Sequence, residues 1–356
     1  MKIARVESTR ERIALSRPYE IASTSTSHVE LFVVRVVPER GPIGLGCAAP
    51  ADYVTGETAA ACAEALSDDR LTDLLAGRDL RQRGGLCRAV EAAMFDTPAA
   101  RAAVDTAVWD AFALMLDLPL VDYLGRCHDF LPTSITIGIK GIDETAAEAR
   151  EYLDRGFCVL KVKLGHSIEE DLARLHKLRE EVGPNIRVRV DANEGYTLPE
   201  TRRLFDAAAK LDLELIEQPV PRDSVEELLD LTPAQREQIA LDESLITDDD
   251  ALEQMMQPLA GLWVLKLMKC GGVTAALRQA TLARAASRHL MWGCMDESVI
   301  SIAAALHAAY ACPATRYLDL DGSFDLSRDP AAGGFSLQGG QLVLTDAPGL
   351  GVTPGG

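Results

Sequence analysis

Apolar and polar positions alternate with a regular rhythm from about residue 133 onward. Short runs of β-branched and aliphatic residues are separated by longer amphipathic segments, such as residues 143–156, 167–183 and 197–212. The runs lie at 134–140, 157–165, 186–196, 213–220, 239–244, 261–272, 290–298 and 315–321. Strands that alternate with helices are typical of a parallel sheet, and eight of them match a closed barrel. We therefore predict an α/β fold built on a TIM barrel.

The chain before residue 125 has a different pattern. Residues 2–8 and 28–37 alternate like strands, a polar loop at 18–27 joins them, and a turn is expected at 41–50. Residues 55–67 and 98–119 carry apolar residues at helical spacing. Asp105 and Asp110 lie within the second of these helices, where we expect them to contact helix ends or an arginine, without a catalytic role.

We predict three parts: an α+β unit over 1–125, the barrel over 126–321, and a C-terminal segment over 322–356. The last segment is rich in glycine and has one strand signal, at 341–346. Because eight strands already complete the barrel, we expect this segment to return to the first unit.

Composition narrows the functional classes. The 356 residues include 47% hydrophobic and 25% charged residues, which is typical of a folded globular protein. A net charge of −18 argues against a nucleic-acid partner. The eight cysteines form no CxxC motif, and no apolar run reaches the roughly 18 residues that a membrane span needs. We expect a cytoplasmic protein without a membrane partner, assembled as a homo-oligomer.

Charged residues recur at the ends of the predicted strands. The spacings are 28, 26, 25, 24 and 53 residues, and the last equals about two steps. The series is Lys163, Asp191, Glu217, Asp242, Lys266 and Asp319. Barrel enzymes keep their catalytic groups at the carboxyl ends of the strands, so these side chains are expected to share one site.

Asp191, Glu217 and Asp242 come from three consecutive strands. Three neighbouring carboxylates repel one another unless a cation lies between them, and an all-oxygen ligand set suits Mg²⁺. Lys163 and Lys266 come from the second and sixth strands, which face each other across an eight-stranded barrel. Two opposed lysines can remove and return a proton at one carbon, while Mg²⁺ and Lys161 stabilise the enediolate. By contrast, we expect Lys269 to reach solvent.

The motifs at these positions resemble those of the enolase superfamily, in its muconate-lactonising subgroup. The matching segments are KVK at 161–163, DAN at 191–193, EQP at 217–219, DES at 242–244 and KLMKCGG from 266. The resemblance implies a modified (β/α)7β barrel capped by the N-terminal unit together with the C-terminal segment. It also implies an essential Mg²⁺ and acid/base roles for Lys163 and Lys266.

Asp319 and Asp321 on the eighth strand point the same way, so both carboxylates can hold one ammonium group. This DxD pattern resembles that of the dipeptide epimerases, which convert an L,L-dipeptide into the L,D form. Thr136 is a further candidate for the substrate pocket. Asp296, Glu297 and Asp52 favour a dipeptide with Lys or Arg side chains, and the loop at 21–27 offers no basic residue for an acidic substrate.

Two alternatives remain open. The first is an N-acylamino-acid racemase or o-succinylbenzoate synthase of the same architecture, whose substrates lack the ammonium that Asp319 and Asp321 would bind. The second is a non-catalytic barrel that binds peptides or metal, against which the two lysines argue.

Overall fold

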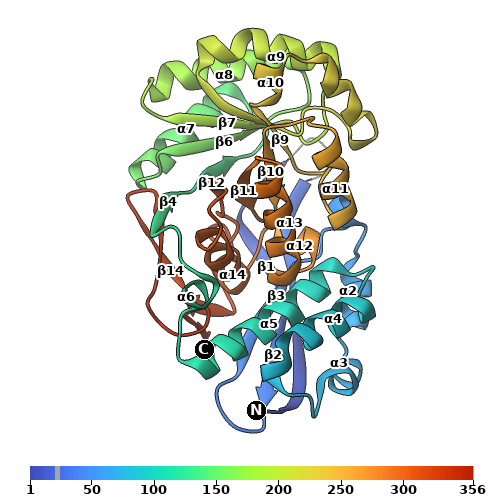
Figure 1. The fold of residues 1–356 in the computed structure, drawn as a ribbon. Coiled ribbons are helices and arrows are strands. Elements are labelled where there is room, and N and C mark those ends of the chain that lie inside the picture. Colours follow the sequence, from blue (N-terminus) through green and yellow to red (C-terminus); the bar gives the residue numbers. More distant parts are fainter. Residues whose placement is uncertain (21–24, 356) are drawn as a thin grey trace.

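The structure is a computed structural model that describes residues 1–20 and 25–355 (Figure 1). Part of the predicted polar loop, residues 21–24, lies outside the described residues. The larger part of the molecule is built on an eight-stranded parallel sheet, whose strands neighbour one another in chain order. These strands are β5 (Ile135–Ile137), β6 (Val159–Lys163), β7 (Arg187–Asp191), β8 (Leu213–Glu217), β9 (Ile239–Leu241), β10 (Leu262–Leu265), β11 (His289–Gly293) and β12 (Thr315–Asp319).

A parallel bridge between Thr133 and Leu318 joins the two edges of this sheet. The eight strands therefore form a barrel, and each coincides with a predicted run, which confirms the predicted fold class. Buried aliphatic residues dominate the strands, as expected where helices cover the outside and side chains fill the inside.

Helices cover the outside of the barrel (Figure 1). They are α7 (Ile142–Asp154), α8 (Ile168–Val182), α9 (Leu198–Leu211), the 3₁₀ segment η2 (Arg222–Asp230), α10 (Pro233–Arg236), α11 (Asp248–Met256), α12 (Leu267–Cys270), α13 (Val273–Ala285) and α14 (Val299–Tyr310). Hydroxyl side chains cap several of them: the Thr247 hydroxyl, for example, accepts from Asp250 N at 3.1 Å and so satisfies one free N–H of the first turn.

The predicted sixth strand, 261–272, is a strand only as far as Leu265. The chain then makes the helical turn α12, in which the N–H groups of Lys269 and Cys270 donate to Lys266 O. Gly272 follows with φ +109°, and a Cβ there would lie 2.8 Å from Asp105 Cβ on the neighbouring helix. The two glycines of the KLMKCGG motif therefore end the helical turn α12 with positive φ and allow close packing against α5.

The N-terminal unit is an antiparallel sheet packed against helices. Its strands are β1 (Ile3–Glu20), β2 (Ser25–Pro38) and β3 (Gly44–Ala48), and its helical segments are α1 (Asp52–Thr55), α2 (Ala59–Ala65), α3 (Asp68–Leu75), η1 (Leu80–Gln82), α4 (Arg83–Ala93), α5 (Pro98–Leu116) and α6 (Leu120–Leu124). Residues 41–50, predicted as a turn, contain the buried strand β3. A Cβ at Gly46 would lie 1.9 Å from Ala103 O on α5, so glycine allows this strand to pack directly on the helix backbone.

Both aspartates of α5 accept backbone hydrogen bonds, but only Asp105 contacts a helix end as expected, whereas Asp110 contacts neither a helix end nor an arginine. Asp105 Oδ2 accepts from Thr274 N at 2.9 Å, at the first turn of α13. Asp110 accepts from Leu45 N and from Leu350 N, each at 2.8 Å. Asp105 therefore links the N-terminal unit to the barrel, and Asp110 links α5 to β3 and the C-terminal segment.

The C-terminal segment contacts both other parts of the chain. Its strands are β13 (Ala331–Gly333), β14 (Phe335–Gln338), β15 (Gln341–Leu344) and β16 (Val352–Pro354), and β15 pairs with β4 (Phe130–Pro132) just before the barrel. Isolated bridges join Leu326 to Leu15 and Gly349 to Pro119. The domain boundaries at 125 and 321 stay predictions.

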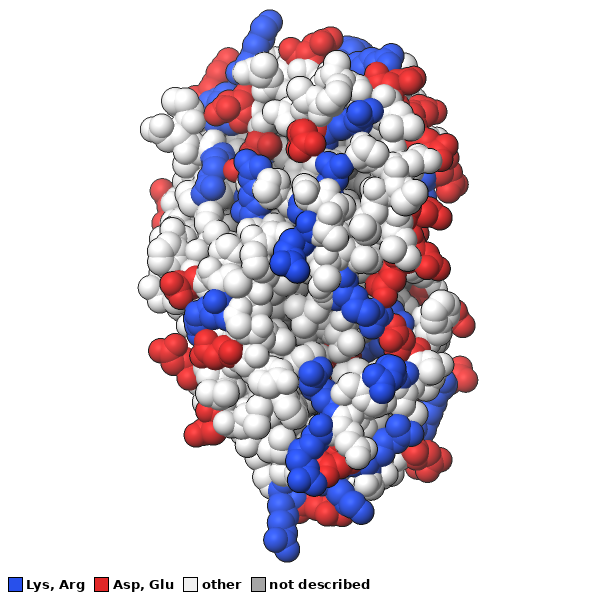
Figure 2. All heavy atoms as spheres, in the orientation of Figure 1, with Lys and Arg blue, Asp and Glu red and all other residues white. Residues whose placement is uncertain are grey.

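Within the described residues, no helix combines the length and the apolar character that crossing a membrane would require. Figure 2 shows that basic and acidic side chains are interspersed on the displayed face, with acidic side chains gathered along the right edge of its upper half. The net charge of −18 is therefore not concentrated in one broad patch on this face.

Candidate active site

One cavity lies between the mouth of the barrel and the N-terminal unit. The barrel contributes Thr136, Lys161, Lys163, Asp242, Lys266, Asp296, Asp319 and Asp321 to its wall. The N-terminal unit contributes Arg17, Tyr19, Tyr53 and Val54. Of the predicted strand-end residues, Lys163, Asp242, Lys266 and Asp319 thus line the cavity, whereas Asp191 and Glu217 are not part of its described lining.

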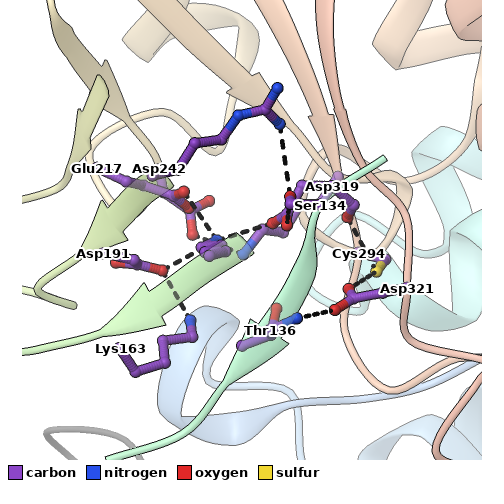
Figure 3. Close-up of polar contacts among 12 residues, drawn as sticks. Ser134, Thr136, Lys163, Asp191, Glu217, Asp242, Cys294, Asp319 and Asp321 are labelled. Atoms are coloured by element: carbon purple, nitrogen blue, oxygen red, sulfur yellow. Dashed lines mark hydrogen bonds and ion pairs between the residues drawn. The ribbon is translucent and has the colours of Figure 1, made fainter. Parts of the chain in front are cut away.

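Lys161 lies at the centre of a network of carboxylates. Its Nζ atom is 2.7 Å from Asp319 Oδ2, 2.8 Å from Glu217 Oε2 and 3.1 Å from Asp191 Oδ2. The side chain is 2% exposed. Figure 3 shows the carboxylates converging from separate strands. Lys161 therefore places a fixed positive charge among buried carboxylates.

Lys163 and Lys266 line this cavity from opposite sides of the barrel. Their strands, β6 and β10, are four steps apart in the ring of eight. Lys163 Nζ is 2.7 Å from Asp191 Oδ2, and Lys266 Nζ is 2.6 Å from Asp242 Oδ2. A Cβ at Gly293 would lie 3.1 Å from Lys266 Cε, so the lysine chain passes close to β11. The predicted opposition of two amines agrees with this strand order.

The carboxylates of this site differ strongly in pKa. Burial raises the pKa of Asp191, but Lys163 and Lys161 lower it more, to about 2. Burial and the charge of Asp191 raise the pKa of Glu217 to about 8, although Lys161 opposes this shift. Negative charge on Glu217 is therefore incompletely compensated by the surrounding side chains.

The donor set fits a hard divalent cation. Within the described residues, Glu217 Oε1 has no polar partner and Oε2 has only its ion pair with Lys161, and the buried Oδ1 of Asn193 and Oε2 of Glu243 accept no hydrogen bond. Oxygen donors of this kind suit Mg²⁺. In residues 1–20 and 25–355, however, no three His, Cys, Asp or Glu side chains are grouped closely enough to hold one ion. Lysine ammonium groups contact the carboxylates instead.

The prediction that Lys269 reaches solvent is wrong. It is 1% exposed, and its Nζ atom donates to Asp242 Oδ1 at 2.5 Å and to Asp242 O at 2.6 Å. The helical turn α12 causes the difference, since it directs Lys269 back toward the end of β9. Asp242 consequently contacts two ammonium groups, those of Lys266 and Lys269.

Two family models match the chain. The model of the mandelate racemase / muconate lactonizing enzyme N-terminal domain matches residues 3–125, and the enolase C-terminal domain-like model matches residues 144–355. The chain belongs to the mandelate racemase / muconate lactonizing enzyme family. This confirms the resemblance to the enolase superfamily that the strand-end motifs indicated.

Individual members of the family align over almost the whole chain. The L-Lys-D/L-Arg epimerase of Methylococcus capsulatus is 52% identical over 99% of both chains. The L-Ala-D/L-Glu epimerase of Bacillus subtilis is 33% identical over 99% of this chain and 97% of that protein. A crystal structure of the dipeptide epimerase from Methylococcus capsulatus, complexed with Mg and the dipeptide L-Arg-D-Lys, superposes with a TM-score of 0.97 and 51% identity, covering 99% of this chain and 100% of that one.

In this family member, the residues predicted to meet an ammonium group lie together. Asp319 ends β12, Asp321 follows two residues later, and both line the cavity. Thr136 N donates to Asp321 Oδ2 at 2.7 Å, so Thr136 contributes its backbone to the site (Figure 3). Burial and the charge of Asp319 raise the pKa of Asp321 to about 7.

The three acidic loop candidates have different surroundings. Asp296 lines the cavity and accepts from the Tyr19 hydroxyl at 2.8 Å; burial raises its pKa to about 6, although Tyr19 lowers it. Glu297 is 1% exposed and accepts from Met295 N, and it is absent from the described lining. Asp52 is exposed and lies in a neighbouring cavity that Asp296 also borders. The structure thus brings only Asp296 to the cavity wall.

Sequence reasoning missed several residues of the site. Tyr19 and Tyr53 come from the N-terminal unit, and Asp325 lines the cavity from just beyond the eighth strand. Ser134 donates to Asp319 Oδ1 at 2.5 Å. The aromatic residues at 19 and 53, in otherwise polar loops, were the available signal. Ser134 gave none, because a serine at the start of a strand is common.

Proposed function

We propose that the chain is an Mg²⁺-dependent dipeptide epimerase that inverts the α-carbon of the second residue of an L,L-dipeptide. The observation that carries this proposal is the pair of lysines on opposite sides of one cavity that also contains Asp319 and Asp321. Two bases on opposite sides of a carbon can invert its configuration, and two carboxylates can bind a free ammonium group. The similarity to proteins named dipeptide epimerases supports the same assignment.

In this proposal, Lys163 and Lys266 exchange the α-proton on the two faces of the carbon. One amine accepts the proton, the other ammonium donates one from the opposite face, and the configuration inverts. Lys161 contributes a buried positive charge beside the substrate carboxylate, where negative charge grows as the proton leaves. Asp191, Glu217 and Asp242 would hold Mg²⁺, which supplies additional positive charge for the enediolate.

We further propose a preference for dipeptides that carry Lys or Arg side chains. Asp296 and Asp325 line the cavity in addition to the DxD pair, and carboxylates select cationic groups through charge-assisted hydrogen bonds. The relative at 52% identity is named for Lys and Arg. Arg17 also lines the cavity from the N-terminal unit, but its positive charge is paired. Its guanidinium nitrogens lie 3.0 Å from Glu148 Oε1 and 2.8 Å from Glu151 Oε1.

A pooled library of L,L-dipeptides in D₂O with Mg²⁺ tests this function. We expect single-deuterium incorporation, detected by mass spectrometry, in dipeptides with Lys or Arg, and loss of incorporation when EDTA removes the metal. N-succinyl and N-acetyl amino acids in a parallel pool test the racemase alternative. Exchange confined to those acylated compounds would reject dipeptide epimerisation, and no exchange in either pool would favour a binding barrel.

Assembly into a homo-oligomer and a cytoplasmic location stay predictions. Light scattering coupled to gel filtration would measure the assembly directly. The side chains of the proposed catalytic site all come from one chain.

A further inference from the structure

Three buried polar side chains form a cluster next to the end of β6, the strand that carries Lys163. Asp171 and Arg174 come from α8, and Tyr196 lies in the loop after β7. Asp171 and Tyr196 are 2% exposed, and Arg174 is 3% exposed. The described lining of the active-site cavity includes none of the three. Any effect of this cluster on a bound substrate must therefore pass through other residues.

Asp171 holds the cluster together. Its Oδ1 atom accepts from Arg174 Nη2 at 2.5 Å. Its Oδ2 atom accepts from Gly165 N at 2.9 Å and from the Tyr196 hydroxyl at 2.5 Å. The N–H of Tyr196 donates to Pro219 O at 2.9 Å, in the loop after β8. Because breaking a buried charge pair leaves a charge without a partner, Arg174 has little freedom to move away from Asp171.

Arg174 connects this cluster to the backbone of Lys163. Arg174 Nη2 donates to Lys163 O at 2.7 Å. β5 ends at Ile137, which pairs with Val162, one residue before Lys163. The carbonyl of Lys163 thus lies beyond the last pair of these two strands, and the guanidinium supplies its donor. Since a buried carbonyl without a donor costs free energy, this hydrogen bond fixes the end of β6.

The backbone of Lys266 is held in a different way. Its carbonyl accepts from the N–H groups of Lys269 and Cys270 in the turn α12. Arg101 of α5 in turn donates to Cys270 O at 2.7 Å. The two candidate bases therefore have separate supports, on α8 for Lys163 and on α12 and α5 for Lys266. A change at one support should reach one base and spare the other.

We infer that Arg174, held by Asp171, is a positioning residue for Lys163 and acts on proton exchange at one face of the substrate carbon. This inference rests on the proposed function, in which Lys163 and Lys266 serve opposite faces. A displacement of about 1 Å can lower a rate roughly 10²-fold, so loss of the hydrogen bond to Lys163 O should slow the proton transfer by Lys163. Proton transfer by Lys266 should change much less.

The experiment compares R174M, R174K and the double variant D171N/R174M in D₂O with Mg²⁺. R174M removes the donor to Lys163 O, and R174K keeps a positive charge. The double variant also removes the donor but leaves no buried carboxylate without its partner. NMR measures the initial rates of α-proton exchange from L-Arg-L-Lys and L-Arg-D-Lys separately, and K163A identifies the epimer whose exchange depends on Lys163. Thermal unfolding checks the fold of each variant.

The matched control is R179M. Arg179 lies on the same helix as Arg174 and also donates to backbone carbonyls, Leu211 O at 2.8 Å and Ile186 O at 2.7 Å. These carbonyls lie just before the starts of β8 and β7, at the end of the barrel opposite to Lys163. R179M therefore removes the same kind of contact without touching the support of either base.

For R174M we expect exchange from the Lys163-dependent epimer to fall about tenfold more than exchange from the other epimer. The double variant should change the ratio of the two rates in the same direction, because it also lacks the donor to Lys163 O. R174K should recover part of the wild-type ratio. R179M should keep the wild-type ratio, even where thermal unfolding shows a loss of stability.

Equal losses from both epimers in folded R174M would overturn the positioning role, because a general defect of the fold slows both faces alike. If R174M does not fold, the double variant decides the question by the same ratio. An active wild type whose ratio is unchanged in every Arg174 variant would reject this inference alone. Wild-type protein that exchanges no dipeptide would reject the proposed function and this inference together.

Discussion

At the scale of single residues, the pairing of each lysine decides the chemistry that is available to it. Lys163 contacts Asp191 and Lys266 contacts Asp242, so each candidate base lies next to a carboxylate of the proposed metal site. The two amines lie on opposite sides of the cavity, on strands four steps apart in the ring of eight. Because each can reach only one face of a carbon bound between them, removing one should impair only one face of the substrate.

We expect Lys266→Ala to lower the rate of α-proton exchange from one epimer of the dipeptide by roughly 10²-fold or more. Exchange from the other epimer should stay measurable, because Lys163 remains. Lys163→Ala should show the reverse preference. Deuterium exchange of the L,L and L,D forms, followed separately by NMR, measures this. Calorimetric titration with Mg²⁺ is the control, since Lys266 contacts Asp242. Equal losses from both epimers with unchanged Mg²⁺ binding would argue against two independent bases.

The charge of the substrate side chains is expected to be recognised by Asp296. We expect Asp296→Asn to lower kcat/KM for L-Arg-L-Lys by about tenfold, and to leave a dipeptide of uncharged side chains, such as L-Gln-L-Met, nearly unaffected. Asp52→Asn is the matched control, because Asp52 is exposed and lies outside the described lining of this cavity. A uniform loss on both dipeptides would mean that Asp296 supports the fold of the site and does not select charge.

At the scale of elements, the sequence predicted the eight strands well because each carries a buried aliphatic run. For six of the eight strands, the charged residue of the series lies at the last strand residue or directly after it. The turn α12 was missed, because its residues continue the apolar pattern of β10 and the turn shows itself only in the hydrogen bonds from Lys269 N and Cys270 N to Lys266 O. The burial of Lys269 follows from that turn and could not be predicted without it.

The positions of loop side chains were also not predictable from the sequence. Asp296 and Glu297 are adjacent acids that sequence reasoning treated alike, yet one lines the cavity and the other turns inward to Met295 N. The contact between Ser134 and Asp319 joins residues 185 positions apart. Such contacts depend on how the barrel closes, so they become visible only in three dimensions.

Asp105 of α5 caps the first turn of α13, where Trp109 Nε1 also donates to the Thr274 hydroxyl at 3.0 Å. We expect Asp105→Ala to lower the free energy of unfolding by about 2 kcal/mol, because Thr274 N and the Thr274 hydroxyl both lose their acceptor in a buried place. Urea unfolding followed by circular dichroism measures this. Asp143→Ala, at an exposed position in the first turn of α7, should change stability by no more than about 0.5 kcal/mol. Similar values for both variants would contradict the capping role.

At the scale of the whole molecule, α14 brings the barrel, α6 and the C-terminal segment together around one buried histidine. His307 is fully buried, and its Nδ1 atom accepts from Val121 N at 3.0 Å. Burial lowers the pKa of His307 to about 4. Because an unfolded chain binds this proton at its ordinary pKa of about 6.5, the folded state should lose stability through this residue as the medium is acidified.

The sign and the range of this effect follow from the two pKa values. Above pH 6.5 the imidazole is neutral in both states, so its contribution is complete; between about 6.5 and 4 only the unfolded chain gains the proton, and up to about 3 kcal/mol is lost. We expect His307→Gln to be less stable than wild type at pH 7, and this difference to shrink by up to that amount at pH 4. Urea unfolding at a series of pH values measures it. His176→Gln, on the exposed face of α8, should show no such convergence. If the difference between wild type and His307→Gln stays constant with pH, protonation of His307 does not couple these three parts of the molecule to acid.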